Sequence, residues 1–151
     1  MMIRSDIPRR FFTKAEQKAI VDSIAEAETL STGEIRTFIE RDLENPGVDP
    51  YLRAREVFAQ LGMQNTAERN GVLVYLAVRS RKFAIVGDEE LHKLVGEDYW
   101  IDIRNQLAAE FAVERFAEGM VAAIRAIGDS LSSYFPPRSD DINELPDDIA
   151  Y

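Results

Sequence analysis

The sequence of 151 residues contains no cysteine and a single histidine, His92. Without cysteine the chain cannot form disulfide bonds, thiolate metal sites or a cysteine nucleophile. A single histidine also excludes the usual zinc sites, which need several histidine or cysteine ligands. Any bound metal is therefore expected to be a hard cation such as calcium, magnesium or manganese, held by carboxylate and carbonyl oxygens.

Basic residues are fewer than acidic ones, with 18 Lys and Arg against 27 Asp and Glu and a net charge of −9. A protein that neutralises phosphates needs a concentrated basic face, so we expect no nucleic-acid partner. Long apolar runs are also absent. No segment has the roughly 20 apolar residues that cross a bilayer, and no apolar run follows the N-terminal basic residues as in a secretory signal. The chain is expected to be cytoplasmic, without a membrane span.

The length is sufficient for one domain that buries about 70% of its unfolded surface. We place this domain at residues 11–136 and treat residues 1–10 as an N-terminal extension. Pro136 and Pro137 end the last helical pattern. Residues 137–151 are acidic and contain few apolar side chains, so they are predicted to form an extended or disordered tail.

Two helices begin at capping signals. Thr13 opens a capping box before the apolar periodicity of a helix over residues 14–28. Asp49 precedes Pro50, which suits the first helical position, and this second helix is expected to end at Gly62. Helical periodicity returns in the second half of the chain, where we predict a short helix over residues 89–95 and two longer helices after it.

Three segments have the composition of strands. Residues 34–40 are enriched in β-branched and aromatic side chains. Residues 71–78 form a nearly continuous apolar run, which is typical of a strand covered on both faces. The link to residues 82–87 is too short for anything but a tight reversal, so this third strand is expected to return antiparallel beside the second.

Polar residues flank these strands at positions that the topology should bring together. A strand, a helix and a second strand in series usually form a right-handed crossover with parallel strands, so the first two strands begin at the same end of the sheet. The third strand ends there. The sequence therefore predicts a site at this sheet end, formed by Glu34, Glu68, Arg69, Asn70 and Asp88.

Each of these residues also has a structural interpretation. Asp88 is a favoured cap for the helix over residues 89–95, and Arg69 can pair with Glu34 or Asp88. Buried carboxylates repel one another, and either a hard cation or the Arg69 guanidinium would relieve that repulsion. His92 is expected to be exposed or hydrogen-bonded rather than a ligand.

Several segments together carry a resemblance to a known family: Phe12-Thr13, residues 31–36, residues 68–73, residues 81–88 and residues 115–119. Over residues 11–135 the chain resembles the TPM domain family, named after a thylakoid lumen protein, Psb32 and MOLO-1, and its tail looks like that of stand-alone bacterial members. The resemblance implies a three-layer α/β/α sandwich with a small mixed central sheet. It also implies divalent-cation binding and, from plant members, an acid phosphatase activity.

Three functional hypotheses follow. In the first, the chain is a soluble interaction module in which calcium or magnesium binds Asp88, Glu34 and Glu68, with Arg69 and Asn70 in support, and orders a loop that faces a protein partner. In the second, it is a metal-dependent phosphatase, although the sequence contains no nucleophile motif. In the third, it is a scaffold that docks through its acidic tail or its C-terminal helix. The sequence leaves the partner and the oligomeric state open.

Overall fold

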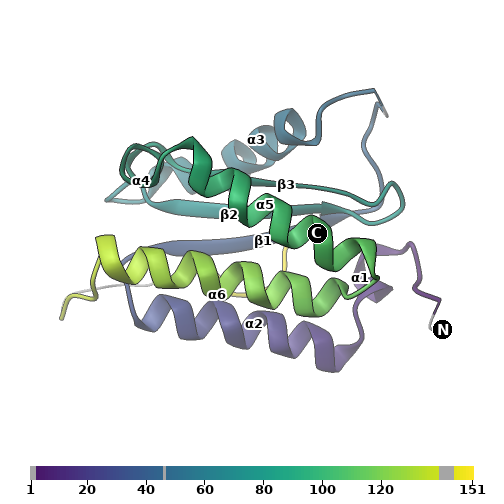
Figure 1. Ribbon diagram of the computed structural model, residues 1–151, viewed down its shortest axis with the longest axis horizontal. Coiled ribbons are helices and arrows are strands. Elements are labelled where there is room, and N and C mark those ends of the chain that lie inside the picture. Colours follow the sequence, from purple (N-terminus) through teal and green to yellow (C-terminus); the bar gives the residue numbers. More distant parts are fainter. Residues whose placement is uncertain (1–2, 46, 140–144) are drawn as a thin grey trace.

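A computed structural model describes residues 3–45, 47–139 and 145–151. Its three strands are β1 (Glu34–Glu40), β2 (Gly71–Ala77) and β3 (Lys82–Gly87), in the order β1-β2-β3. β1 and β2 are parallel, whereas β2 and β3 are antiparallel. The predicted mixed sheet is confirmed, and in Figure 1 it lies between α3 on one side and α2 with α6 on the other.

The helices begin where the capping signals place them. The Thr13 side chain accepts from the Glu16 backbone N–H and the Glu16 side chain accepts from that of Thr13, as in a capping box. At the start of α3 the Asp49 side chain accepts from the Tyr51 backbone N–H. The helical elements are α1 (Pro8–Phe11), α2 (Lys14–Thr29), α3 (Pro50–Gln60), the short 3-10 helix η1 (Met63–Asn65), α4 (Glu89–Val95), α5 (Glu97–Ala112) and α6 (Phe116–Tyr134).

The sheet separates two hydrophobic clusters. Ile35, Val72 and Val74 face the larger cluster with α2, α5 and α6, whereas Leu73 and Tyr75 face the smaller cluster under α3. Every residue of β2 is buried, which confirms the strand covered on both faces. Full burial of one large apolar side chain contributes about 1.5 to 3 kcal/mol to stability. Since β2 buries such side chains in both clusters, it links the two clusters.

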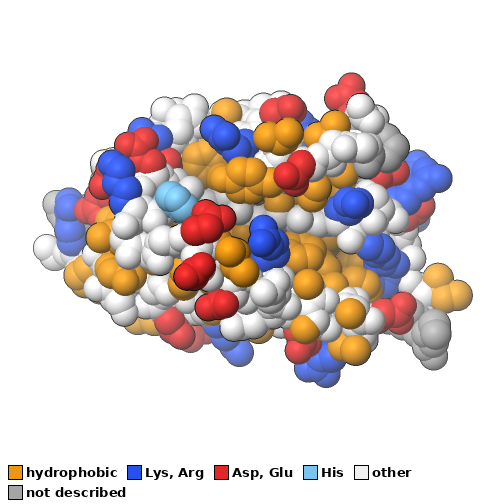
Figure 2. Space-filling view, turned by 45° about the horizontal axis from the view of Figure 1, so that its top comes forward, with side chains coloured by type: hydrophobic (Ala, Val, Ile, Leu, Met, Phe, Trp, Pro, Cys, Tyr) orange, Lys and Arg blue, Asp and Glu red, His pale blue; other side chains and the backbone are white. Residues whose placement is uncertain are grey.

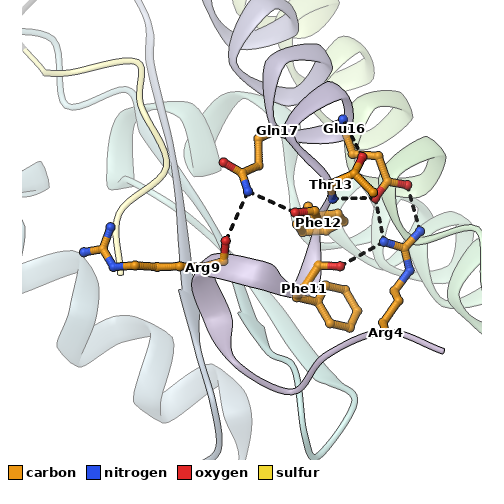
Figure 3. Close-up of polar contacts among 7 residues, drawn as sticks. All are labelled: Arg4, Arg9, Phe11, Phe12, Thr13, Glu16 and Gln17. Carbon is orange, nitrogen blue, oxygen red and sulfur yellow. Dashed lines mark hydrogen bonds and ion pairs between the residues drawn. The ribbon is translucent and has the colours of Figure 1, made fainter.

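The N-terminal segment packs on the domain through Arg4 (Figure 3). The Arg4 guanidinium donates to both carboxylate oxygens of Glu16, at 2.6 and 2.7 Å, and to the Phe11 carbonyl at 3.0 Å. It also lies over the ring of Phe116, 5.5 Å from the centroid. Part of the predicted extension at residues 1–10 therefore packs on the domain, because the Arg4 guanidinium is paired with Glu16 and stacked on an aromatic ring.

The outer edge of β1 is covered by the C-terminal segment. Ala150 donates its N–H to the Thr37 carbonyl at 2.8 Å and accepts from the Ile39 N–H at 2.9 Å. This is a parallel bridge, and Ile149 beside it is buried. Of the predicted tail, residues 140–144 lie outside the described residues, whereas the chain end is extended and adds to the sheet.

None of the helices formed by the described residues has both the length and the apolar character needed to cross a membrane.

Candidate functional site

The strand register brings the three polar patches to one end of the sheet. Glu34 lies opposite Gly71 across the parallel pair, and the Asp88 N–H donates to the Gly71 carbonyl at 2.9 Å. The starts of β1 and β2 and the end of β3 therefore meet as the crossover argument predicts. Their side chains nevertheless fall into three separate groups.

The first group is an ion pair between Arg69 and Asp88. Arg69 has a positive φ of 51°, and its side chain reaches the end of β3. Its Nε donates to Asp88 Oδ2 at 2.8 Å and its Nη2 donates to Oδ1 at 2.9 Å, the two-pronged arrangement that suits guanidinium and carboxylate. Asp88 Oδ1 also accepts from the Glu89 N–H at 2.8 Å, so Asp88 caps α4 as well. The hydrogen bonds that Arg69 donates to Asp88, together with the negative charge of Asp88, raise the pKa of Arg69.

The second group surrounds Glu68. The Thr32 hydroxyl donates to Glu68 Oε2 at 2.6 Å, and Arg138 donates to Oε1 at 2.7 Å. Asn70 is buried and donates from Nδ2 to the Thr32 hydroxyl at 3.2 Å. Among the described residues no group donates to the buried Asn70 Oδ1. This amide oxygen is therefore a buried acceptor that the described part of the chain does not satisfy.

The third group contains Glu34 and two carboxyl groups that sequence reasoning did not include. Glu34 is buried, and its carboxyl group interacts with that of Glu28 from α2, which also interacts with Asp147 from the C-terminal segment. Burial, followed by the hydrogen bonds with Asp147 and Glu34, raises the pKa of Glu28 well above the usual carboxyl range. The tertiary approach of residues 145–151 creates this group, so no local pattern could have revealed it.

These groups do not form a ready-made metal centre. Within residues 3–45, 47–139 and 145–151, no three acidic or histidine side chains are arranged to hold a metal ion. Both carboxylate oxygens of Asp88 already bind Arg69, and both of Glu68 are hydrogen-bonded. The donors are hard oxygens of the kind that calcium and magnesium prefer, so a cation fits their chemistry only if it takes the place of a guanidinium.

A groove of about 770 Å³ extends from this sheet end along β3. One wall is α3 and the other is formed by α4 and α5. Trp100 packs against Gly87 so closely that a Cβ there would lie 2.2 Å from its ring. The Trp100 indole N–H donates to His92 Nδ1 at 3.0 Å, which agrees with the expectation of a hydrogen-bonded histidine.

A further polar group lies under α3 and was not anticipated. Arg53 from α3 forms two hydrogen bonds with Glu40, at 2.9 and 3.1 Å, and the buried Tyr75 hydroxyl donates to the same carboxylate. Burial and the Glu40 carboxylate raise the pKa of Tyr75. A tyrosine inside the apolar run of β2 was the available signal, because a buried hydroxyl requires a partner.

The mixed three-strand sheet, the two helical layers and the polar sheet end define a small α/β/α domain. The sequence profile of the TPM domain family matches residues 7–130, so the chain belongs to this family. A search of the curated proteins finds no match.

Solved structures provide the remaining comparisons. The BA42 protein of the psychrophilic bacterium Bizionia argentinensis is 41% identical, with a TM-score of 0.84 over 93% of this chain and 95% of that one. The N-terminal domain of cg2496 from Corynebacterium glutamicum is 18% identical, with a TM-score of 0.64 over 87% and 80%. An N-terminal domain from P. gingivalis is 16% identical, with a TM-score of 0.61 over 82% and 78%. The last two likenesses show the fold alone.

Proposed function

We propose that this TPM domain is an interaction module whose loop over residues 63–70 responds to a divalent cation, calcium or magnesium. The observation that carries the proposal is the Arg69–Asp88 pair. The Asp88 carboxylate is 5% exposed, whereas the Arg69 side chain that neutralises it is 41% exposed and belongs to the loop. A buried carboxylate needs positive charge beside it, and an accessible guanidinium can be exchanged for another cation.

Asp88 would hold the cation. Glu68 and Asn70, which belong to the neighbouring group in this structure, would move with the loop towards this cation. When bound, it would supply the positive charge that Arg69 and Arg138 supply in its absence. The buried Asn70 Oδ1 supports this assignment, because it is a hard oxygen without a donor in the described part of the chain. Arg69, no longer held by Asp88, would turn outwards and change the surface that the loop offers to a partner.

The test is a titration of metal-stripped, isotope-labelled protein with calcium and then magnesium, followed through backbone amides by NMR. We expect saturable shifts confined to residues 63–71 and Asp88. Asp88→Asn should abolish them, because the variant keeps the cap but lacks the charge. Asp102→Asn removes an exposed acidic side chain from α5 and serves as the matched control. Shifts restricted to residues 145–151, or identical shifts in both variants, would contradict the proposal.

Hydrolysis of a phosphomonoester is the second candidate function. It is favoured by the position of Arg69, an accessible guanidinium at the end of the groove and beside a carboxylate. Turnover of a chromogenic aryl phosphate, measured with and without magnesium, tests it. A role of Asp88 in the chemistry predicts that Asp88→Asn loses turnover while remaining folded, and unchanged turnover would remove this residue from the reaction.

A further inference from the structure

The two edges of the sheet are used differently. The outer edge of β1 is closed by the chain itself, through the parallel bridge between Phe38 and Ala150. β3 is the strand at the opposite edge, and among the described residues nothing pairs with its outer side. An unpaired edge presents N–H and C=O groups to which another strand can add, and proteins either protect such an edge or use it to bind a partner.

The hydrogen-bond pattern shows which groups of β3 point outwards. The Val78 N–H donates to β1 and the Gly71 carbonyl accepts from Asp88, so the odd-numbered residues of β2 pair with β3. Through the antiparallel register these partners are the even-numbered residues of β3. Since the groups alternate along a strand, the N–H and C=O groups of Phe83, Ile85 and Gly87 point away from the sheet.

These outward groups form the floor of the groove described above. Phe58 from α3 and Trp100 from α5 are among the apolar side chains of its two walls. Figure 2 shows this side of the molecule, where hydrophobic side chains gather in a band bordered by charges of both signs. A groove with apolar walls and a floor of unpaired backbone groups matches an extended chain better than a helix or a compact ligand.

Two arginines line the middle of the groove and favour acidic residues there. The acidic side chains of the lining lie towards its ends, at the starts of α3, α4 and α5: Asp49, Asp88, Glu89 and Glu97. Arg55 lies on α3 one turn before Phe58, whose ring approaches Gly71. Arg104 lies on α5 between Trp100, which packs on Gly87, and Phe111, which packs on Phe83. Both are therefore beside the middle of β3, on opposite walls. Both are exposed, and neither has an ion-pair partner in the described part of the chain.

We propose that this groove binds an extended acidic segment of a partner protein, which adds to the sheet as a fourth strand beside β3. Side chains of a strand alternate between its two faces. Two adjacent acidic residues therefore point to opposite walls, one towards Arg55 and the other towards Arg104. The proposal rests on the interaction-module function and names its partner chemistry, but it does not require a bound cation.

The probe is a capped eight-residue peptide of valine and threonine with two adjacent aspartates at its centre. A peptide with two lysines in their place is the control. Each is titrated into labelled protein, once with a chelator and once with calcium, and backbone amides are followed by NMR. We expect the aspartate peptide to shift the amides of Phe83, Ile85 and Gly87 most, and to slow their exchange with solvent.

Charge reversal separates the groove from general electrostatics. Arg55→Glu and Arg104→Glu should each weaken the aspartate peptide about fivefold or more, because each places a like charge beside the peptide. Arg125→Glu, an exposed arginine on α6, makes the same change in net charge and should leave the affinity within about twofold.

Several outcomes would overturn the proposal: equal binding of the lysine peptide, equal effects of all three reversals, or no shifts at β3. Concentration-dependent shifts at these amides without peptide would assign the edge to a second copy of the chain instead. The two proposals fail separately, since cation-induced shifts at residues 63–71 without peptide binding at β3 would refute the groove and leave the cation response standing.

Discussion

At the residue scale, Glu28 is the side chain whose ionisation the fold opposes most clearly. Its carboxyl group is raised in pKa by burial and by the carboxyl groups of Asp147 and Glu34. The folded state therefore binds a proton that the unfolded chain releases near its ordinary pKa of 4.5. The stabilisation that this proton provides is complete below that value and is lost as the pH rises above it.

Glu28→Gln is expected to stabilise the protein at neutral pH. The amide can still accept from the Ile35 N–H and can donate to a neighbouring carboxylate, but it has no proton to lose. We expect the free energy of unfolding at pH 7 to rise by about 1 kcal/mol or more. Between about pH 5 and pH 8 the stability of the variant should fall less than that of the unsubstituted protein. Urea unfolding at several pH values measures both.

Glu26→Gln is the control for this prediction, because Glu26 is an exposed carboxylate on the same helix. If Glu28→Gln and the control have parallel stability profiles, the carboxyl group of Glu28 is not protonated in the folded protein.

Gly87 is a second residue whose identity is dictated by a close contact. A Cβ at this position would lie 2.2 Å from the Trp100 ring, so Gly87→Ala must displace that ring. We expect a loss of about 1 to 3 kcal/mol, the usual range for overpacking. Fluorescence of Trp100, the only tryptophan, reports its displacement directly.

Gly47→Ala provides the comparison for Gly87→Ala, because a Cβ there would meet its nearest neighbour at an ordinary 3.7 Å. Equal stability and unchanged fluorescence for both variants would show that Trp100 does not pack on Gly87.

At the scale of elements, the C-terminal segment acts as a short added strand. Deletion of residues 145–151 removes two backbone hydrogen bonds with β1 and the buried side chain of Ile149. We expect a loss of about 2 to 4 kcal/mol in the free energy of unfolding. The exposed β1 edge should also increase self-association, which sedimentation measures.

Ile149→Ala keeps the backbone bonds and removes only apolar contacts, so it should cost less than the deletion and leave self-association unchanged. A deletion that changes neither stability nor association would show that the segment contributes nothing to the sheet. A segment that the sheet does not need would be available to bind a partner, as the third functional hypothesis requires.

At the scale of the whole molecule, β2 connects the two hydrophobic clusters and is paired along both edges. Its amides should therefore exchange with solvent only when the molecule unfolds globally. Along β3 we expect alternation, with the amides of Phe83 and Ile85 exchanging at least about tenfold faster than those of Ala84 and Val86. Hydrogen exchange followed by NMR tests this, and uniform protection along β3 would refute the open edge.

The sequence by itself determined the elements and how they connect. Helix starts at Thr13 and Asp49 follow from capping chemistry, and the apolar run of β2 follows from burial on both faces. The direction of the strands follows from crossover handedness and a short link. These rules concern neighbouring residues or the order of elements, so a single sequence is sufficient to apply them. The same rules placed Glu34, Arg69 and Asp88 at one sheet end.

Only the tertiary structure decided which side chains meet there. Arg69, which has a positive φ, pairs with Asp88 rather than Glu34. Glu34 is instead beside Glu28, and Asp147 joins them through a segment that returns more than a hundred positions later in the chain. Contacts of this kind depend on how separate elements pack, and no spacing within one element encodes them. The open edge of β3 is likewise a property of the assembled sheet, because it depends on the order of the strands and on where the chain end lies. Among the described residues that end pairs with β1, and no strand pairs with the outer side of β3.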